Sequence, residues 1–145
     1  MSEAPYKLSE GLWLEKAGLL IPWFSSLGEI NGLGGSRLPE KGKASQLFWD
    51  NESVLSGLAV AIQAFPRGAG TFHLTRRGTT FSSAQEEYPA TLSELTKRFG
   101  QPHETRTENS YPVNRWRWED IFLTLTMGER FMDYVALSVS KGVTK

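Results

Sequence analysis

The chain has 145 residues and a formal net charge of zero, from 16 basic and 16 acidic side chains, so it lacks the positive field with which a dedicated nucleic-acid or anionic-membrane binder attracts its ligand. Hydrophobic residues make up 39% of the sequence and aromatic residues 12%, which excludes a disordered chain and suffices for the core of one domain. Cysteine is absent, which excludes disulfides, thiolate metal sites and thiol nucleophiles.

The first ten residues, MSEAPYKLSE, are polar and acidic where a signal peptide has a basic start and an apolar run. The apolar stretch 17–24 is too short to cross a bilayer and is interrupted by Pro22. We therefore expect residues 1–10 to form a loose N-terminal arm and residues 11–145 to form a single domain. We also expect this domain to reside in a reducing, bacterial cytoplasm.

Matching signals predict two short helices. A hydroxyl residue followed three positions later by glutamate is a capping box, and this pattern occurs at residues 26–29 and again at residues 91–94. A glycine typical of a helix exit follows each box, at Gly35 and at Gly100. We therefore expect helices that begin near residues 26 and 91, each followed by a polar loop.

The elements around these helices also recur in order. Residues 12–18 predict a short strand that ends at a glycine, and residues 72–78 repeat its order of residue types. Residues 54–60 align with residues 121–127 at an offset of 67 (121 − 54 = 67). These matches indicate a tandem duplication with pseudo-repeats at approximately 11–70 and 71–140. Coincidence is the alternative, because capping boxes and strand alternation are common.

The fold class that we expect is α+β. Two tandem strand-helix-meander units form one antiparallel sheet, with short helices on one face and an open opposite face. Residues 115–140 predict two antiparallel strands joined by a Gly-Glu-Arg turn at residues 128–130. Period-two alternation assigns the buried face to Trp116, Trp118, Ile121, Leu123, Leu125, Met127, Val135, Leu137 and Val139.

The reverse face combines small polar residues with aromatic residues and arginines. It carries Arg115, Arg117, Phe122, Thr124, Thr126, Tyr134, Ala136, Ser138 and Ser140. Recognition surfaces favour tyrosine, phenylalanine and arginine, so this face is either a partner-binding surface or a solvated sheet face. We expect the two tryptophans on the buried face to be core anchors; a stacking platform for single-stranded nucleic acid is the alternative, which the zero net charge disfavours.

No residue cluster in the sequence fixes a chemistry. The two histidines, His73 and His103, have glutamates nearby in the sequence but no spacing that a catalytic geometry or a zinc site requires. The glycine-rich residues 31–35 follow a predicted helix, whereas a phosphate-binding loop precedes one. We therefore expect no catalytic residue, no metal and no cofactor.

A helix that ends in Phe-Gly-Gln-Pro at residues 99–102 and leads to a strand entered by tryptophan resembles the helix-and-meander modules of beta-lactamase inhibitory proteins and of the outer-membrane assembly lipoprotein BamE. The chain is also similar to small, cysteine-free bacterial immunity proteins. This resemblance implies an immunity protein that occludes the active site of a cognate toxin, delivered by a contact-dependent or type VI system.

In that role the expected partner is the toxin, with no nucleic acid and no membrane involved. The candidate contacts are Arg115, Arg117, Phe122 and Tyr134 on the open face, and Glu86, Glu87, Tyr88, Glu104 and Tyr111 on loops. Two alternatives stay open: a cytoplasmic secretion chaperone or adaptor, and a small enzyme that uses His73 or His103.

Overall fold

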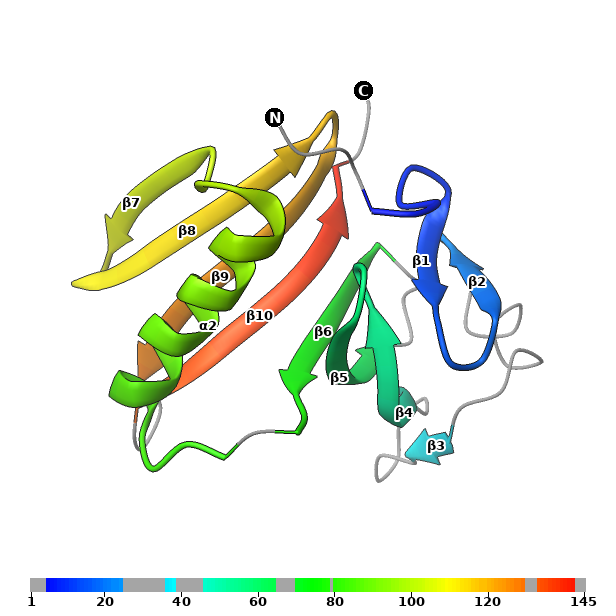
Figure 1. Ribbon diagram of the computed structural model, residues 1–145, viewed down its shortest axis with the longest axis horizontal. Coiled ribbons are helices and arrows are strands. Elements are labelled where there is room, and N and C mark those ends of the chain that lie inside the picture. The colour runs from blue at the N-terminus through cyan, green and yellow to red at the C-terminus, as the bar shows by residue number, and fades with distance from the viewer. Residues whose placement is uncertain are drawn as a thin grey trace.

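The computed structural model of the protein describes residues 5–24, 36–38, 46–64, 70–78, 80–129 and 133–142. These residues form ten strands and one helix (Figure 1). The strands are β1 (Gly11–Leu14), β2 (Leu19–Pro22), β3 (Ser36–Leu38), β4 (Gln46–Val54), β5 (Leu58–Ala64), β6 (Thr71–Arg76), β7 (Glu104–Glu108), β8 (Tyr111–Trp118), β9 (Ile121–Glu129) and β10 (Asp133–Lys141), and the helix is α2 (Ala84–Phe99).

Eight of the strands form one antiparallel sheet in the order β3-β4-β5-β6-β10-β9-β8-β7, and β1 pairs with β2 in a separate hairpin. The large sheet consists of two four-stranded meanders, β3 to β6 and β7 to β10, which meet along their last strands (Figure 1). The α+β class with an antiparallel sheet is thus confirmed. Residues 26–35, where the first helix was expected, lie outside the described residues, so the tandem strand-helix units stay a prediction.

The two meanders have the same register where they meet. Leu74 of β6 lies opposite Leu137 of β10, and these two leucines are 63 positions apart (137 − 74 = 63). At the same offset, the pair of Ile62 with Leu74 in the first meander corresponds to the pair of Leu125 with Leu137 in the second. The pairing pattern is therefore locally two-fold symmetric about the Leu74–Leu137 pair.

Two segments expected as continuous strands are in fact interrupted by hairpin turns. Residues 55–57 separate β4 from β5, and residues 119–120 separate β8 from β9. Leu55 and Glu119 have φ angles of 52° and 56°, the left-handed conformation that tight hairpin turns require. A glutamate such as Glu119 rarely adopts that conformation, so the sequence signal for the β8–β9 turn is weak, whereas the β4–β5 turn also contains Ser56-Gly57, a common turn pair. Because the pairing of β5 with β6 matches that of β9 with β10 at an offset of 63, the predicted offset of 67 is wrong for β5.

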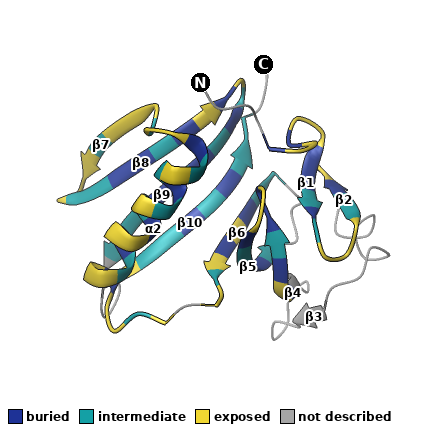
Figure 2. Ribbon diagram, viewed as in Figure 1, coloured by how far each residue is buried: buried dark blue, intermediate teal, exposed yellow. Residues whose placement is uncertain are grey.

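The helix α2 and the β1–β2 hairpin lie over the same face of the sheet, and their apolar side chains form one core with it (Figures 1 and 2). The predicted buried face of β8 to β10 is confirmed, with Met127 and Val135 partly buried and the other members buried. Trp116 donates from Nε1 to the carbonyl of Gly100 at 2.8 Å, and the Trp118 ring packs edge-to-face on Phe99. Both tryptophans are therefore core anchors.

The helix begins earlier than expected. Ser83 is its N-cap, and the Ser83 hydroxyl accepts a hydrogen bond from the backbone N–H of Glu86 at 3.2 Å. Thr91, expected at the start, is buried in the middle and accepts a hydrogen bond from Arg76 at 3.2 Å. Pro89, which precedes the expected start, lies inside the helix and lacks one helical hydrogen bond. The predicted exit at Gly100 is confirmed.

The described part of the chain contains no helix with the length and apolar character needed to span a bilayer. The segment expected as an N-terminal arm contributes one residue, Leu8, to the core. Leu8 is buried, and its carbonyl accepts a hydrogen bond from Trp23 Nε1 at 2.7 Å.

Two carboxylates fasten the β1–β2 hairpin to the sheet. Glu52 of β4 is 3% exposed and accepts hydrogen bonds from the backbone N–H groups of Lys16 (2.7 Å), Ala17 (3.2 Å) and Ser53 (2.8 Å). In return, Glu15 of the β1–β2 turn accepts hydrogen bonds from backbone N–H groups in the turn between β4 and β5. Each carboxylate thus satisfies donors of the other element, which fixes the hairpin against β4.

Glu52→Gln should lower the free energy of unfolding by about 1–3 kcal/mol, because the amide presents its own donors to backbone N–H groups that need an acceptor. Denaturant unfolding followed by tryptophan fluorescence measures this change. Asp50→Asn is the matched control, since the Asp50 side chain is 75% exposed and pairs with Arg77 at the surface. Equal unfolding midpoints for the two variants would contradict the role given to Glu52.

Candidate functional site

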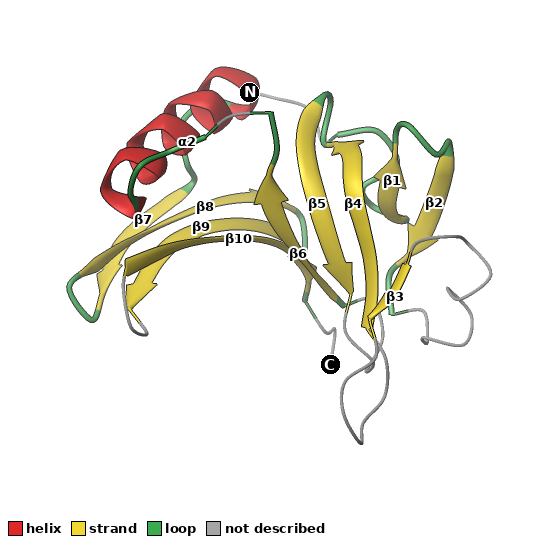
Figure 3. Ribbon diagram, turned by 90° about the horizontal axis from the view of Figure 1, so that it is seen from below, coloured by secondary structure: helices red, strands yellow, loops and turns green. Residues whose placement is uncertain are grey.

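The face of β8 to β10 that points away from α2 is covered by no described element. Figure 3 shows these strands as an arch, with α2 on the outer side and a concave surface on the inner side. A row of polar residues crosses the open face, each opposite the next on the neighbouring strand: Gln63, His73, Ser138, Thr124, Arg115 and Glu104. The predicted division into a buried and a reverse face is therefore correct.

One end of this face is hollowed into a groove of about 780 Å³. The β7–β8 hairpin forms one wall, and β9 and β10 form the floor. The groove is lined by Arg106, Glu108, Asn109, Tyr111, Val113, Arg115, Thr124, Thr126, Met127, Gly128 and Tyr134. Of the expected contacts, the structure thus brings Arg115, Tyr111 and Tyr134 together around one hollow.

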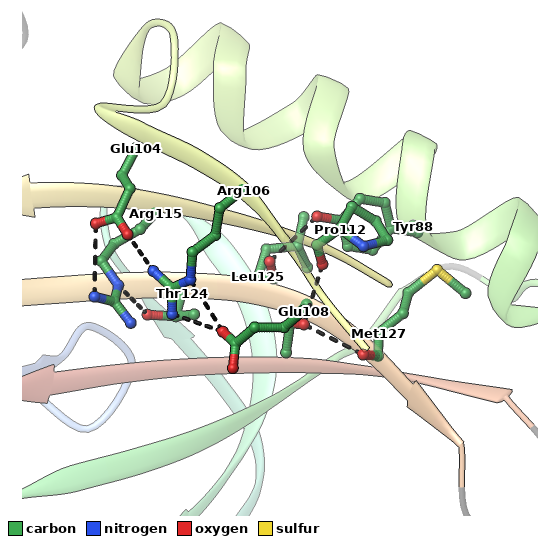
Figure 4. A network of polar contacts seen from close by, with 10 residues as sticks. Tyr88, Glu104, Arg106, Glu108, Pro112, Arg115, Thr124, Leu125 and Met127 are labelled. Carbon is green, nitrogen blue, oxygen red and sulfur yellow. Dashed lines mark hydrogen bonds and ion pairs between the residues drawn. The ribbon is translucent and has the colours of Figure 1, made fainter. Parts of the chain in front are cut away.

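A chain of charged side chains runs along the wall of the groove (Figure 4). Arg106 makes ion pairs with Glu104 and with Glu108 on its own strand, and these bonds raise its pKa further above the ordinary value. Arg115 lies 3.7 Å from the same Glu104 and donates from Nε to the Thr124 hydroxyl at 3.3 Å. Glu104 lies on β7 and not on the expected loop, and its carboxylate contacts both Arg106 and Arg115.

Beside the groove, one aromatic ring carries two guanidinium groups. The Arg115 guanidinium lies 5.2 Å from the centre of the Phe122 ring, and the Arg117 guanidinium lies 5.6 Å from it. Arg117 is exposed and donates from Nε to the carbonyl of Glu119 at 2.6 Å. We call these three side chains the Arg-Phe-Arg stack; it unites three of the four residues expected on the open face.

Tyr134, the fourth of these residues, is 48% exposed and lies across Gly128. A Cβ atom built on Gly128 would lie 2.6 Å from the Tyr134 hydroxyl oxygen, so the absence of a side chain at position 128 lets the ring lie flat. Gly128 is within β9, and the turn predicted at residues 128–130 is wrong in its first two positions, since Glu129 pairs with Asp133.

The remaining expected contacts lie elsewhere. Glu86, Glu87 and Tyr88 are on the first turns of α2, not on a loop. Tyr88 is buried, its hydroxyl donates to the carbonyl of Leu125 at 3.2 Å and accepts from Asn114 Nδ2 at 2.6 Å, and burial raises its pKa. Bonds from Ser82 lower the pKa of Glu86, and burial raises that of Glu87. None of the three lines the groove.

A second hollow of about 330 Å³ lies between α2 and β7. Its deepest polar residue, Asn114, is 5% exposed and has partners for its side chain: Nδ2 donates to Tyr88, and Oδ1 accepts from the Thr105 hydroxyl at 2.9 Å. This hollow is smaller than the groove, and the Asn114 side chain at its floor already has hydrogen-bond partners within the protein.

The two histidines lie on different parts of the sheet. His73 is on β6, and partial burial lowers its pKa. His103 accepts a hydrogen bond at Nδ1 from the backbone N–H of Arg117 on β8 at 2.8 Å. Three strand spacings, about 14 Å, separate β6 from β8, so the imidazoles do not share a site. Among the described residues, no group of His, Asp and Glu is arranged to hold a metal ion.

Sequence reasoning missed one wall of the groove. Residues 101–114 were expected to form a polar loop, but they contain β7 and the start of β8. The sequence Glu-Thr-Arg-Thr-Glu has no apolar face, because an edge strand is solvated on both sides. The sequence signal for this hairpin was the pair Asn109-Ser110, since asparagine is common in tight hairpin turns. In the structure these two residues have φ angles of 50° and 70° and join β7 to β8.

Comparisons with known proteins give no match of this chain to a protein-family model, to a curated protein or to a solved structure. The geometry of the open face therefore carries the functional argument.

Gly128→Ala should move the Tyr134 ring off β9, because the added methyl group occupies the position where the ring now lies. The stability should change by less than about 1 kcal/mol, since the ring can turn toward solvent and alanine restricts the unfolded chain. Loss of the NMR contacts between the Tyr134 ring and residue 128 is the expected result. Gly142→Ala is the control, because its Cβ has ordinary contacts of 3.5 Å. An unchanged Tyr134 ring position would refute this account.

Proposed function

We propose that this protein is a cytoplasmic immunity protein that binds a cognate bacterial toxin through the open face and occludes the toxin's active site. The observation that carries this proposal is the groove of about 780 Å³ on the concave side of the sheet. Arginine and tyrosine, which concentrate binding energy in protein interfaces, line it at Arg106, Arg115, Tyr111 and Tyr134.

The position of the groove also favours a protein ligand. Its floor consists of paired strands whose other side is packed against α2, so little conformational freedom remains to be lost on binding. A standard protein interface buries roughly 800 Å² on each partner, and an open concave sheet face next to the Arg-Phe-Arg stack suits contact of that extent.

The proposal includes two tandem units in the fold. The shared register about the Leu74–Leu137 pair supports a duplication, with an offset of 63 positions in the inner strands. In this arrangement the first unit has its helix at residues 26–35, as the sequence predicts, and both meanders contribute strands to the open face.

Thr124→Arg should abolish protection against the toxin. The substitution places a bulky cation in the groove, which Thr124 lines. We expect affinity for the toxin encoded beside this gene to fall by about 30-fold or more, equivalent to about 2 kcal/mol. Calorimetry with the purified toxin and growth of toxin-expressing cells measure the loss.

The matched control is Ala90→Arg, which adds the same side chain at an exposed position of α2 and should leave binding and protection unchanged. Loss of binding in both variants, or in neither, would refute the open face as the binding site. A purified toxin that does not bind the wild-type protein at all would refute the immunity function itself.

A further inference from the structure

The Arg-Phe-Arg stack carries more positive charge than its surroundings neutralise. Arg115 shares the Glu104 carboxylate with Arg106, which also pairs with Glu108. Arg117 makes no ion pair in the described part of the chain. The charge of the two guanidinium groups on the Phe122 ring is therefore neutralised only in part, by the Glu104 carboxylate that Arg106 also binds.

The two acidic residues of the β8–β9 turn, Glu119 and Asp120, form no ion pair with Arg115 or Arg117 in the described part of the chain. Asp120 lies 3.9 Å from Lys141. Glu119 contributes its backbone carbonyl to Arg117, and His103 contributes Nδ1 to the backbone N–H of Arg117. The protein therefore positions Arg117 through bonds to neutral acceptors and leaves its charge for another ligand.

The bonds that hold the two arginines use the inner nitrogen of each side chain. Nε of Arg115 donates to Thr124, and Nε of Arg117 donates to the carbonyl of Glu119. For Arg117, neither terminal nitrogen has an acceptor among the described residues, and this pair of N–H groups matches the two oxygens of a carboxylate. Both guanidinium groups contact the Phe122 ring, so part of their side-chain freedom is already lost before a ligand binds.

We propose that the Arg-Phe-Arg stack binds a carboxylate side chain, aspartate or glutamate, on the segment of the partner protein that enters the groove. This inference rests on the proposed function for the partner being a protein. A carboxylate fits better than a nucleic-acid phosphate backbone, because the chain has zero net charge and lacks the positive field that binds a long polyanion, whereas the two terminal nitrogens of one guanidinium group match one carboxylate. The cognate active site would accordingly be rich in carboxylates.

The test uses a short acidic peptide, acetyl-Asp-Glu-Asp-Glu-amide, titrated into the full chain at low ionic strength while the arginine Nε–Hε signals are followed by NMR. The signals of Arg115 and Arg117 should shift saturably, and that of Arg77, which pairs with Asp50 on β4, should not. The amide analogue acetyl-Asn-Gln-Asn-Gln-amide should produce no shift.

Arg117→Gln should weaken binding of the acidic peptide by about fivefold, while Arg77→Gln should leave it unchanged. The proposal is overturned if the acidic peptide shifts neither signal, or if a single-stranded oligonucleotide or inorganic phosphate shifts them and the peptide does not. These outcomes are independent of the Thr124→Arg test with the toxin, so a failure of the carboxylate site can be told from a failure of the immunity function.

Discussion

The pairing of β6 with β10 is the contact on which the architecture depends. It joins segments more than fifty residues apart in the chain, Thr71–Arg76 and Asp133–Lys141, and it converts two four-stranded meanders into one eight-stranded sheet. Without this pairing, each meander would expose the unpaired backbone groups of its last strand and the apolar side chains of its part of the core. Because Phe72, Leu74, Leu137 and Val139 at this junction are all buried, the same pairing also makes the hydrophobic core continuous.

The apolar face of a continuous sheet must be covered by other elements, and in this protein two separate elements cover different strands. α2 packs on β9 and β10, and the β1–β2 hairpin packs on β4 through the exchange of Glu15 and Glu52. Both covers lie on the same side, so the small polar residues of the other side have no described element above them. The open face is thus a consequence of how the core is closed.

The part of the fold that could be predicted is the part where period-two alternation is strong. Residues 116–118, 121–127 and 135–139 alternate so regularly that both faces were assigned correctly. Alternation by itself does not report a turn, which is why the breaks at residues 55–57 and 119–120 were missed, although Ser56-Gly57 is a turn signal. It also fails for β7, whose charged residues have no apolar side, and so the wall of the groove could not be placed from the sequence.

The same reasoning explains why the sequence indicated the residues of the open face but not their arrangement. Arg115, Arg117 and Phe122 stand on neighbouring strands, and their contact depends on the register that sets Arg117 opposite Phe122. A register one residue different would turn Phe122 into the core and separate the two arginines from any aromatic ring. The turn at residues 119–120 fixes that register, because its two residues leave Trp118 paired with Ile121. The charged surface and the core beneath it are therefore set by a single short turn, and a change in its length would alter both at once.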